Sequence, residues 1–246
     1  MAENVKGDRF MYKSVALKIL KRVRSNFEQT HTYRQVEANR FRHLSLEFYC
    51  EKQKELEHLG FSYLADFEDE LLKKQSPDPR TFIRVMTSGD GLVNAGIYQI
   101  RPNIIWRILM YFFGVRHTRI VEFQSELENG CQIVTSNIQE NFMMPTSPML
   151  CRSFMPASTP IEALFNSHKN NLEEARQKTG MQPLANRTLK DILEFENRQI
   201  KIQKEYLKSI GWVTKEYLPK QGANQKNAQA IYDEIQKILK EEENEL

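Results

Sequence analysis

Residues 81–100 read TFIRVMTSGDGLVNAGIYQI, two apolar runs of strand length on either side of a Ser-Gly-Asp-Gly turn. Such runs around a glycine-rich turn are typical of a β-hairpin. Residues 119–127 and 131–138 repeat the arrangement around Glu128, Asn129 and Gly130, and the Asn-Gly pair predicts a type I′ turn. Consecutive hairpins with short turns predict an antiparallel meander rather than a parallel sheet.

The sequence on either side of the hairpins adds strands and helices. Aromatic or apolar side chains occupy every second position over residues 61–67, which predicts a strand, and residues 149–155 are a sixth candidate strand. Apolar residues recur at helical spacing over 8–27, 41–59, 159–179, 188–211 and 224–240. A capping box of Thr159 and Glu162 predicts one helix start. We expect an α+β fold: a five- or six-stranded antiparallel meander covered by helices, with a C-terminal helical extension.

The length of 246 residues allows one or two domains. We expect a basic amphipathic N-terminal helical segment over 1–40, an α+β core domain over 41–180 and the C-terminal helical extension over 181–246. Three cysteines cannot form a disulfide framework, and their odd number suggests a reducing compartment. Because neither a secretory signal nor a transmembrane stretch is visible, we expect a cytoplasmic protein, or one at the inner face of a membrane.

Charge is distributed unevenly along the chain. Residues 1–42 carry a net charge of +6, residues 43–222 are neutral, and residues 223–246 carry −3. The basic N-terminal region (1–42) and the acidic C-terminal region (223–246) either bind different partners or attract each other. The apolar stripe of the first helix either packs on the protein's own core or faces an anionic membrane or a partner. Acidic residues at the end of the last helix oppose the helix dipole, so this end should fray.

The segment Pro102–Gly114 is apolar on every side apart from Arg107, and it is too short to span a bilayer. It either closes one face of the sheet as core or forms a membrane or partner surface. The residues that we expect to make membrane or partner contacts are Lys13, Lys18, Lys21, Arg22, Arg24, Ile105, Trp106, Leu109, Phe112 and Phe113.

Metal and nucleophile chemistry finds little support in the sequence. Glu28 with His31, and Glu55 with His58, have the i, i+3 spacing of di-iron bundles, but two solvated helix faces explain them as well. The default for cysteine is a buried, inert side chain, although Arg152 beside Cys151 could stabilise a thiolate. We expect no metal and no cofactor.

Other polar residues are interpreted as structural. His168 falls on the apolar stripe of its helix, which predicts a core histidine bonded to backbone. Glu122, Gln124 and Glu126 share one face of a strand, which we expect to be the solvated face. The acidic residues of 66–70 are expected on a solvated sheet edge that discourages strand pairing.

The sequence contains no recognised catalytic motif. The leading interpretation is a non-catalytic binding or scaffolding protein that contacts a membrane surface or a protein partner through segment 102–114 and the basic N-terminal helix. A protein partner or self-association is expected, an anionic membrane is a further candidate, and nucleic acid is not an expected partner. The alternative is a small-ligand-binding protein or an enzyme with a pocket between the sheet and its helices, which convergent polar groups would favour.

Overall fold

The computed structural model describes residues 2–25, 27, 31–75, 80–100, 119–138, 144–221 and 225–244. The chain forms two compact units. The smaller unit comprises Met1–Gln29, Asn141–Ser147 and Ile200–Leu246, and the larger unit comprises Thr30–Glu140 and Pro148–Gln199. Among the described residues, no helix is both long and apolar enough to cross a membrane.

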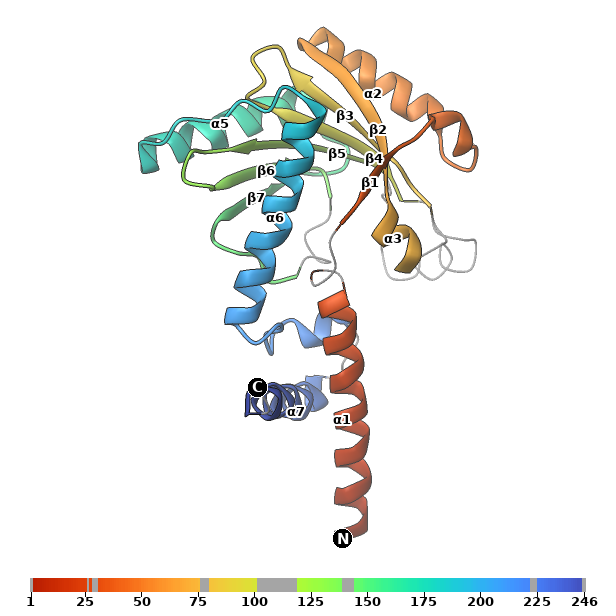
Figure 1. Ribbon diagram of the computed structural model, residues 1–246, viewed down its shortest axis with the longest axis vertical. Helices are drawn as coiled ribbons and strands as arrows, with labels where there is room; N and C mark the ends of the chain where they lie inside the picture. Colours follow the sequence, from red (N-terminus) through yellow and green to blue (C-terminus); the bar gives the residue numbers. More distant parts are fainter. Residues whose placement is uncertain are drawn as a thin grey trace. The chain divides into compact units, whose positions relative to one another are not determined.

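The larger unit contains a seven-stranded mixed sheet whose strand order follows the chain (Figure 1). The strands are β1 (Tyr33–Gln35), β2 (Phe61–Asp69), β3 (Ile83–Ser88), β4 (Asn94–Gln99), β5 (Arg119–Glu126), β6 (Gln132–Ser136) and β7 (Leu150–Phe154). Neighbours pair antiparallel from β1 to β6, whereas β6 and β7 are parallel.

The α+β class is confirmed, but the expectation of a five- or six-stranded, wholly antiparallel sheet is wrong. The three residues of β1 are too few to show a period in the sequence. No tight turn joins β6 to β7, because residues 137–149 lie between them, and a longer connection allows parallel pairing.

Both predicted hairpins form, as β3 with β4 and β5 with β6. The type I′ assignment for the second turn is wrong, because Gly130 has a φ of +80° while Asn129 does not have a positive φ. The amide of Leu127 bonds to the carbonyl of Cys131, and the amide of Gly130 bonds to the carbonyl of Leu127. This is a three-residue loop in which only the last residue is left-handed, a conformation that glycine adopts at low cost.

Helices α2 (Leu46–His58) and α5 (Ile161–Thr179) cover one face of the sheet (Figure 1). Alternate residues of the strands point at them and form an apolar core that includes Met86, Ile97 and Phe123. Helix α5 begins at Ile161 after Pro160, with no side-chain cap, so the predicted capping box of Thr159 and Glu162 does not form.

The first half of α6 (Leu189–Ser209) lies over the opposite face of the sheet (Figure 1). Its start is capped as its sequence predicts: the Asp191 carboxylate accepts the amide of Thr188 at 2.8 Å, and the Thr188 hydroxyl accepts the amide of Asp191 at 3.2 Å. Ile192 packs with Ala65, Phe67 and Val85 in a small apolar cluster. Toward β4, β5 and β6 the same face becomes polar.

The acidic residues at the end of β2 do not lie on a solvated edge, because β1 pairs with β2. Asp66 is 3% exposed and Glu68 is 2% exposed. Arg84 donates to both oxygens of Asp66 at 2.8 Å, and Arg80 donates to both oxygens of Glu68 at 2.6 and 2.9 Å. Each buried carboxylate is neutralised by an arginine, and Glu68 is also paired with Arg34 at 3.0 Å, an arrangement that the acidic run alone did not reveal. The short helices α3 (Glu70–Gln75) and η1 (Ala38–Arg40) flank this region in sequence.

The smaller unit is helical and contains α1 (Ala2–Ser25), α7 (Gln225–Asn244) and the short η3 (Leu218–Gln221). The apolar stripe of α1 packs on the unit's own core, where Ala16 and Leu20 meet Ile231 and Ile235. Arg24 donates to both carboxylate oxygens of Glu242 at 3.1 and 2.7 Å, so the basic N-terminal region and the acidic C-terminal region do attract each other here. Helix α7 extends to Asn244, beyond the end near Lys240 that its apolar periodicity predicts.

Candidate functional site

The sheet face beneath α6 gathers polar side chains from four adjacent strands. Register places Asn94 on β4 opposite Gln124 on β5, Gln124 opposite Val134 on β6, and Val134 opposite Arg152 on β7. Because side chains alternate along a strand, residues two positions apart share this face. The residues that it presents from these strands include Asn94, Tyr98, Glu122, Gln124, Glu126, Gln132 and Arg152.

The expectation that Glu122, Gln124 and Glu126 form a solvated face is wrong. Gln124 is 9% exposed, Glu126 is 2% exposed and Glu122 is half-buried. Arg198 on α6 donates to both oxygens of Glu126 at 2.9 and 2.6 Å, which holds the helix over the sheet. The alternation along β5 showed that the three residues share a face, but a helix more than 60 positions later decides that the face is covered.

A pair of carboxyl groups lies at the centre of this face. The amide of Gln124 donates to Glu122 Oε1 at 2.6 Å, and the interaction with Gln124 also lowers the pKa of Glu196 on α6. Burial raises the pKa of Glu122. Burial, and then the charge of Glu122, raise the pKa of Glu196 to about 7. A carboxyl group with such a pKa can both bind and release a proton at neutral pH.

One arginine and one tyrosine complete the group that we call the carboxyl cluster: Tyr98, Glu122, Gln124, Arg152 and Glu196. The positive charge of Arg152 lowers the pKa of both carboxyl groups, but burial outweighs it. Burial, followed by the charge of Glu122, raises the pKa of Tyr98 well above its usual value. With both carboxyl groups ionised, the cluster therefore carries one more negative than positive charge.

Buried amides beside the carboxyl cluster lack hydrogen-bond partners among the described residues. Both polar atoms of the Asn94 side chain and both of Gln132 are in this state, and these residues are only 3% and 0% exposed. The Nε atom of Arg152 and the Nε2 atom of Gln199 also lack a hydrogen-bond partner among the described residues. A buried polar group left unsatisfied costs about 1–3 kcal/mol, so several on one face call for an explanation.

The titratable groups of β1 and β2 extend the cluster along the same face. His31 Nδ1 lies 2.6 Å from Asp69 Oδ2. Burial, and then the charges of Glu196 and Asp69, raise the pKa of Tyr33. The charge of His31 in turn lowers the pKa of Glu196. Perturbed pKa values gathered in this way are typical of functional sites, although structural ion-pair networks also produce them.

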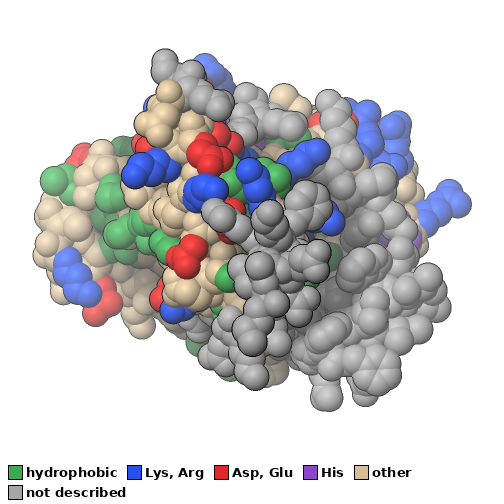
Figure 2. All heavy atoms as spheres, turned by 90° about the horizontal axis from the view of Figure 1, so that it is seen from below, with side chains coloured by type: hydrophobic (Ala, Val, Ile, Leu, Met, Phe, Trp, Pro, Cys, Tyr) green, Lys and Arg blue, Asp and Glu red, His purple; other side chains and the backbone are tan. Residues whose placement is uncertain are grey.

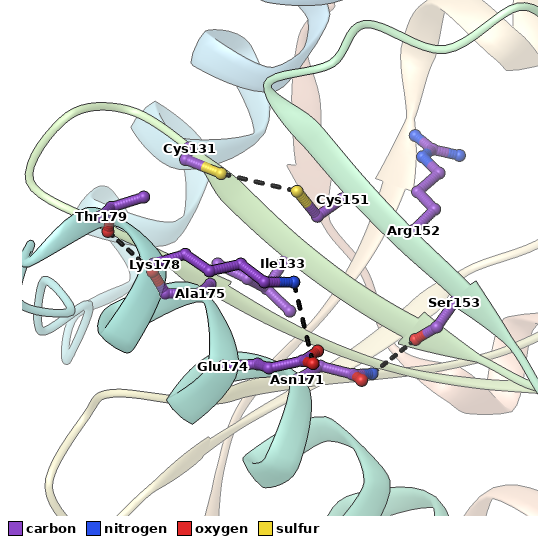
Figure 3. Close-up of a pocket in the computed structure, with 10 residues that line it drawn as sticks. All are labelled: Cys131, Ile133, Cys151, Arg152, Ser153, Asn171, Glu174, Ala175, Lys178 and Thr179. Atoms are coloured by element: carbon purple, nitrogen blue, oxygen red, sulfur yellow. Dashed lines mark hydrogen bonds and ion pairs between the residues drawn. The ribbon is translucent and has the colours of Figure 1, made fainter.

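On the opposite face, a cavity of about 250 Å³ lies between β6, β7 and α5, lined in part by Cys131, Cys151, Asn171 and Lys178 (Figure 3). The two sulfur atoms are 3.7 Å apart. Cys131 is buried, as expected, whereas Cys151 is exposed. In Figure 3 the Arg152 side chain points away from the cysteines, so it is not placed to stabilise a Cys151 thiolate as its sequence position had suggested.

His168 is fully buried, as predicted, but its partners are hydroxyl groups rather than backbone. Its Nε2 lies 3.0 Å from Ser125 Oγ and its Nδ1 lies 3.1 Å from Thr135 Oγ1. Burial lowers the pKa of His168 to about 3, so the ring is neutral at physiological pH. Ser125 is also 0% exposed, which leaves this serine and histidine no access to a substrate.

The residues predicted to contact a membrane or partner fall into two groups. Ile105, Trp106, Leu109, Phe112 and Phe113 lie outside the described residues. On α1, Lys13, Lys18, Lys21 and Arg22 are exposed, whereas Arg24 is half-buried between Glu242 and the ring of Trp212. In Figure 2, basic side chains lie among acidic and hydrophobic ones on the face in view.

Of the two Glu–His pairs with di-iron spacing, the structure describes only Glu55 with His58 in full. Glu28 lies outside the described residues, and Glu55 is paired with Lys52 at 2.6 Å. Within the described ranges, no three His, Cys, Asp or Glu side chains are grouped so as to hold a metal ion.

Comparisons with known proteins identify no relative of this chain. The chain matches no protein-family model, no curated protein and no solved structure.

Proposed function

We propose that the larger unit binds a small organic cation at the carboxyl cluster between the sheet and α6. The observation that carries the proposal is the convergence of Glu122 and Glu196 beside the buried amides of Asn94 and Gln132, which have no hydrogen-bond partner in the part of the chain that the structure describes. Two half-buried carboxyl groups that share one arginine are costly to ionise, which is why their pKa values are raised. A ligand with a basic nitrogen offsets this charge, and its further polar atoms satisfy the amides.

The half-buried state of the carboxyl groups supports a ligand role over a purely structural one. Structural carboxylates in this unit are buried against their own arginines, as Asp66 is against Arg84 and Glu126 against Arg198. Glu122 and Glu196 instead share the charge of Arg152 and the amide of Gln124. They therefore keep capacity for a further donor.

The test measures the melting temperature with three probes of similar length: 1,4-diaminobutane, 1,4-butanediol and succinate. A ligand at ten times its Kd stabilises the folded protein by roughly 1.4 kcal/mol, which raises the melting temperature by about 3–6 °C. We expect the diamine alone to do so. Equal stabilisation by the diol would show that charge plays no part, and stabilisation by succinate would reverse the assigned sign.

Matched variants of α6 locate the effect. Glu196→Gln should abolish stabilisation by the diamine, because it removes a carboxylate while keeping the size of the side chain. Glu194→Gln is the control, since Glu194 lies exposed on the same helix. A diamine response that survives in both Glu196→Gln and Glu122→Gln would rule out the carboxyl cluster as the site.

A second candidate function is contact with an anionic membrane or an acidic partner through α1. The four exposed cations Lys13, Lys18, Lys21 and Arg22 support it, at about 1 kcal/mol for each residue near an anionic lipid surface. The apolar stripe of α1 gives less support, because it packs on α7.

Co-sedimentation with phosphatidylserine vesicles tests this second candidate. Binding should weaken as salt rises, and Lys18→Gln with Lys21→Gln should reduce it. The Trp106→Ser, Phe113→Ser double variant measures the separate contribution of segment 102–114. If the wild-type protein stays in the supernatant at low salt, the membrane role is wrong.

A further inference from the structure

The thiols of Cys131 and Cys151 form a close pair at the β7 edge of the sheet. Their sulfur atoms are 3.7 Å apart (Figure 3). Cys151 lies on β7, and Cys131 immediately precedes β6, the parallel neighbour on which Ile133 lies opposite Cys151. A disulfide needs a sulfur–sulfur distance of about 2.05 Å, so closure requires the two sulfur atoms to approach each other further.

The two thiols differ in their exposure to solvent. Cys151 is exposed and Cys131 is buried, and both line the cavity of about 250 Å³. Burial, and then the neighbouring Cys151, raise the pKa of the Cys131 thiol to about 11. The amide of Cys131 is held by Asn129 Oδ1 at 3.0 Å, which fixes the backbone at the point where the thiol emerges.

We propose that Cys131 and Cys151 are a reversible redox pair in which Cys151 reacts first with a peroxide and Cys131 then closes an intramolecular disulfide. The proposal is independent of the carboxyl cluster, since the thiols belong to the opposite face of the sheet. The cavity admits an oxidant as small as hydrogen peroxide to both sulfur atoms.

The reaction has two balanced steps. The Cys151 thiolate attacks one peroxide oxygen, the O–O bond breaks, and the departing hydroxide takes a proton to become water, leaving Cys151 as a sulfenic acid. Cys131 sulfur then attacks Cys151 sulfur, the S–O bond breaks, and the hydroxyl group leaves as water with the Cys131 proton. Peroxide is reduced to two molecules of water as the two thiols lose two hydrogen atoms. Dithiothreitol returns both thiols.

Intact-protein mass spectrometry and thiol titration in denaturant test the pair. After hydrogen peroxide, the Cys50→Ser protein should lose both remaining thiols and two hydrogen atoms of mass, and a proteolytic digest should contain a Cys131–Cys151 cross-linked peptide. Dithiothreitol should reverse all three changes. If both thiols stay titratable, or if oxidised wild-type protein keeps an oxygen atom on Cys151, the pair is not a redox couple.

Single variants test the assigned order of reaction. Cys131→Ala should arrest the reaction at a Cys151 sulfenic acid that dimedone captures, and Cys131→Ser checks the result should the smaller side chain disturb the fold. Cys151→Ser should slow oxidation of Cys131 by at least about tenfold, because a buried thiol of raised pKa reacts poorly. Unchanged oxidation of Cys131 in that variant would overturn the order. Cys50→Ser should form the disulfide at the wild-type rate, since Cys50 lies on α2.

Discussion

The side-chain amide of Gln124 donates to a carboxylate oxygen of Glu122, two residues earlier on β5, at 2.6 Å, and its interaction with Glu196 on α6 lowers the pKa of that carboxyl group. Both carboxyl groups interact with this one amide, and burial raises the pKa of both. Because the folded protein raises the pKa of both carboxyl groups, the free energy of unfolding of the larger unit should depend on pH.

Replacement of Glu196 by glutamine should remove a loss of stability that accompanies the rise from acid to neutral pH. The pKa of Glu196 is about 7 in the folded protein and near 4.3 in an unfolded chain, so the folded state binds more protons between these values. Wild-type stability should then fall as pH rises from about 4.5 to about 7, by up to ~3 kcal/mol. Urea unfolding at pH 5, 6, 7 and 8 should show a smaller decline in Glu196→Gln, whereas Glu194→Gln should follow the wild type.

His168 should produce the opposite slope on the acid side. Its pKa is about 3 when folded and 6.5 in the unfolded chain, so stability is complete above pH 6.5 and is lost as pH falls toward 3. His168→Asn should flatten the decline over this range, while costing about 1–3 kcal/mol at pH 7 because Ser125 and Thr135 lose a partner. Acid-induced unfolding followed by circular dichroism checks both effects. A decline as steep as that of the wild type would contradict the neutral, buried histidine.

Loss of the Asp66 charge should destabilise the protein strongly. Asp66→Asn leaves Arg84 buried at 8% exposure without its carboxylate, and an uncompensated buried charge typically costs about 3–5 kcal/mol. The Asp66→Asn, Arg84→Met double variant should cost less than the sum of the single variants, because it removes both charges. Additive free energies of unfolding would mean that the two residues are not coupled.

Gly130→Val should destabilise the β5–β6 hairpin by about 1–2 kcal/mol, because a side chain raises the energy of the left-handed conformation. The φ of Gly130 is +80°, and nothing lies within 4 Å of the place that a Cβ would occupy, so backbone strain alone is tested. Gly89→Ala in the other hairpin is the control, since Gly89 has no positive φ and its Cβ would meet only ordinary contacts. An unchanged denaturation midpoint for Gly130→Val would contradict the turn geometry.

The sequence predicted the elements whose signals are local. The two hairpins, the helix that begins after Thr188 and the glycine after β5 each depend on residues within one turn or one strand. The strand pair β6–β7 could not be predicted, because parallel pairing depends on how a long connection runs. Turn type also failed, since Asn-Gly permits two loop geometries and the hydrogen bonds of Leu127 select one.

The candidate site escaped prediction because polarity was interpreted as exposure. Glu122, Gln124 and Glu126 showed strand spacing, but their burial comes from α6, and Glu196 gave no sign of its partners. The thiol pair was hidden for a similar reason: Cys131 and Cys151 are 20 positions apart, and only strand register brings them together.

The parallel attachment of β7 has a consequence for the order in which the sheet folds. Hairpins such as β3–β4 and β5–β6 close over short loops and form within about 1–10 μs, whereas a parallel strand must wait for its longer connection to close. Cys131 lies beside Cys151 only once β7 has docked. The rate at which Cys131 becomes protected from a thiol-labelling reagent during refolding therefore times the completion of the sheet, and Cys50 on α2 serves as an internal reference in the same chain.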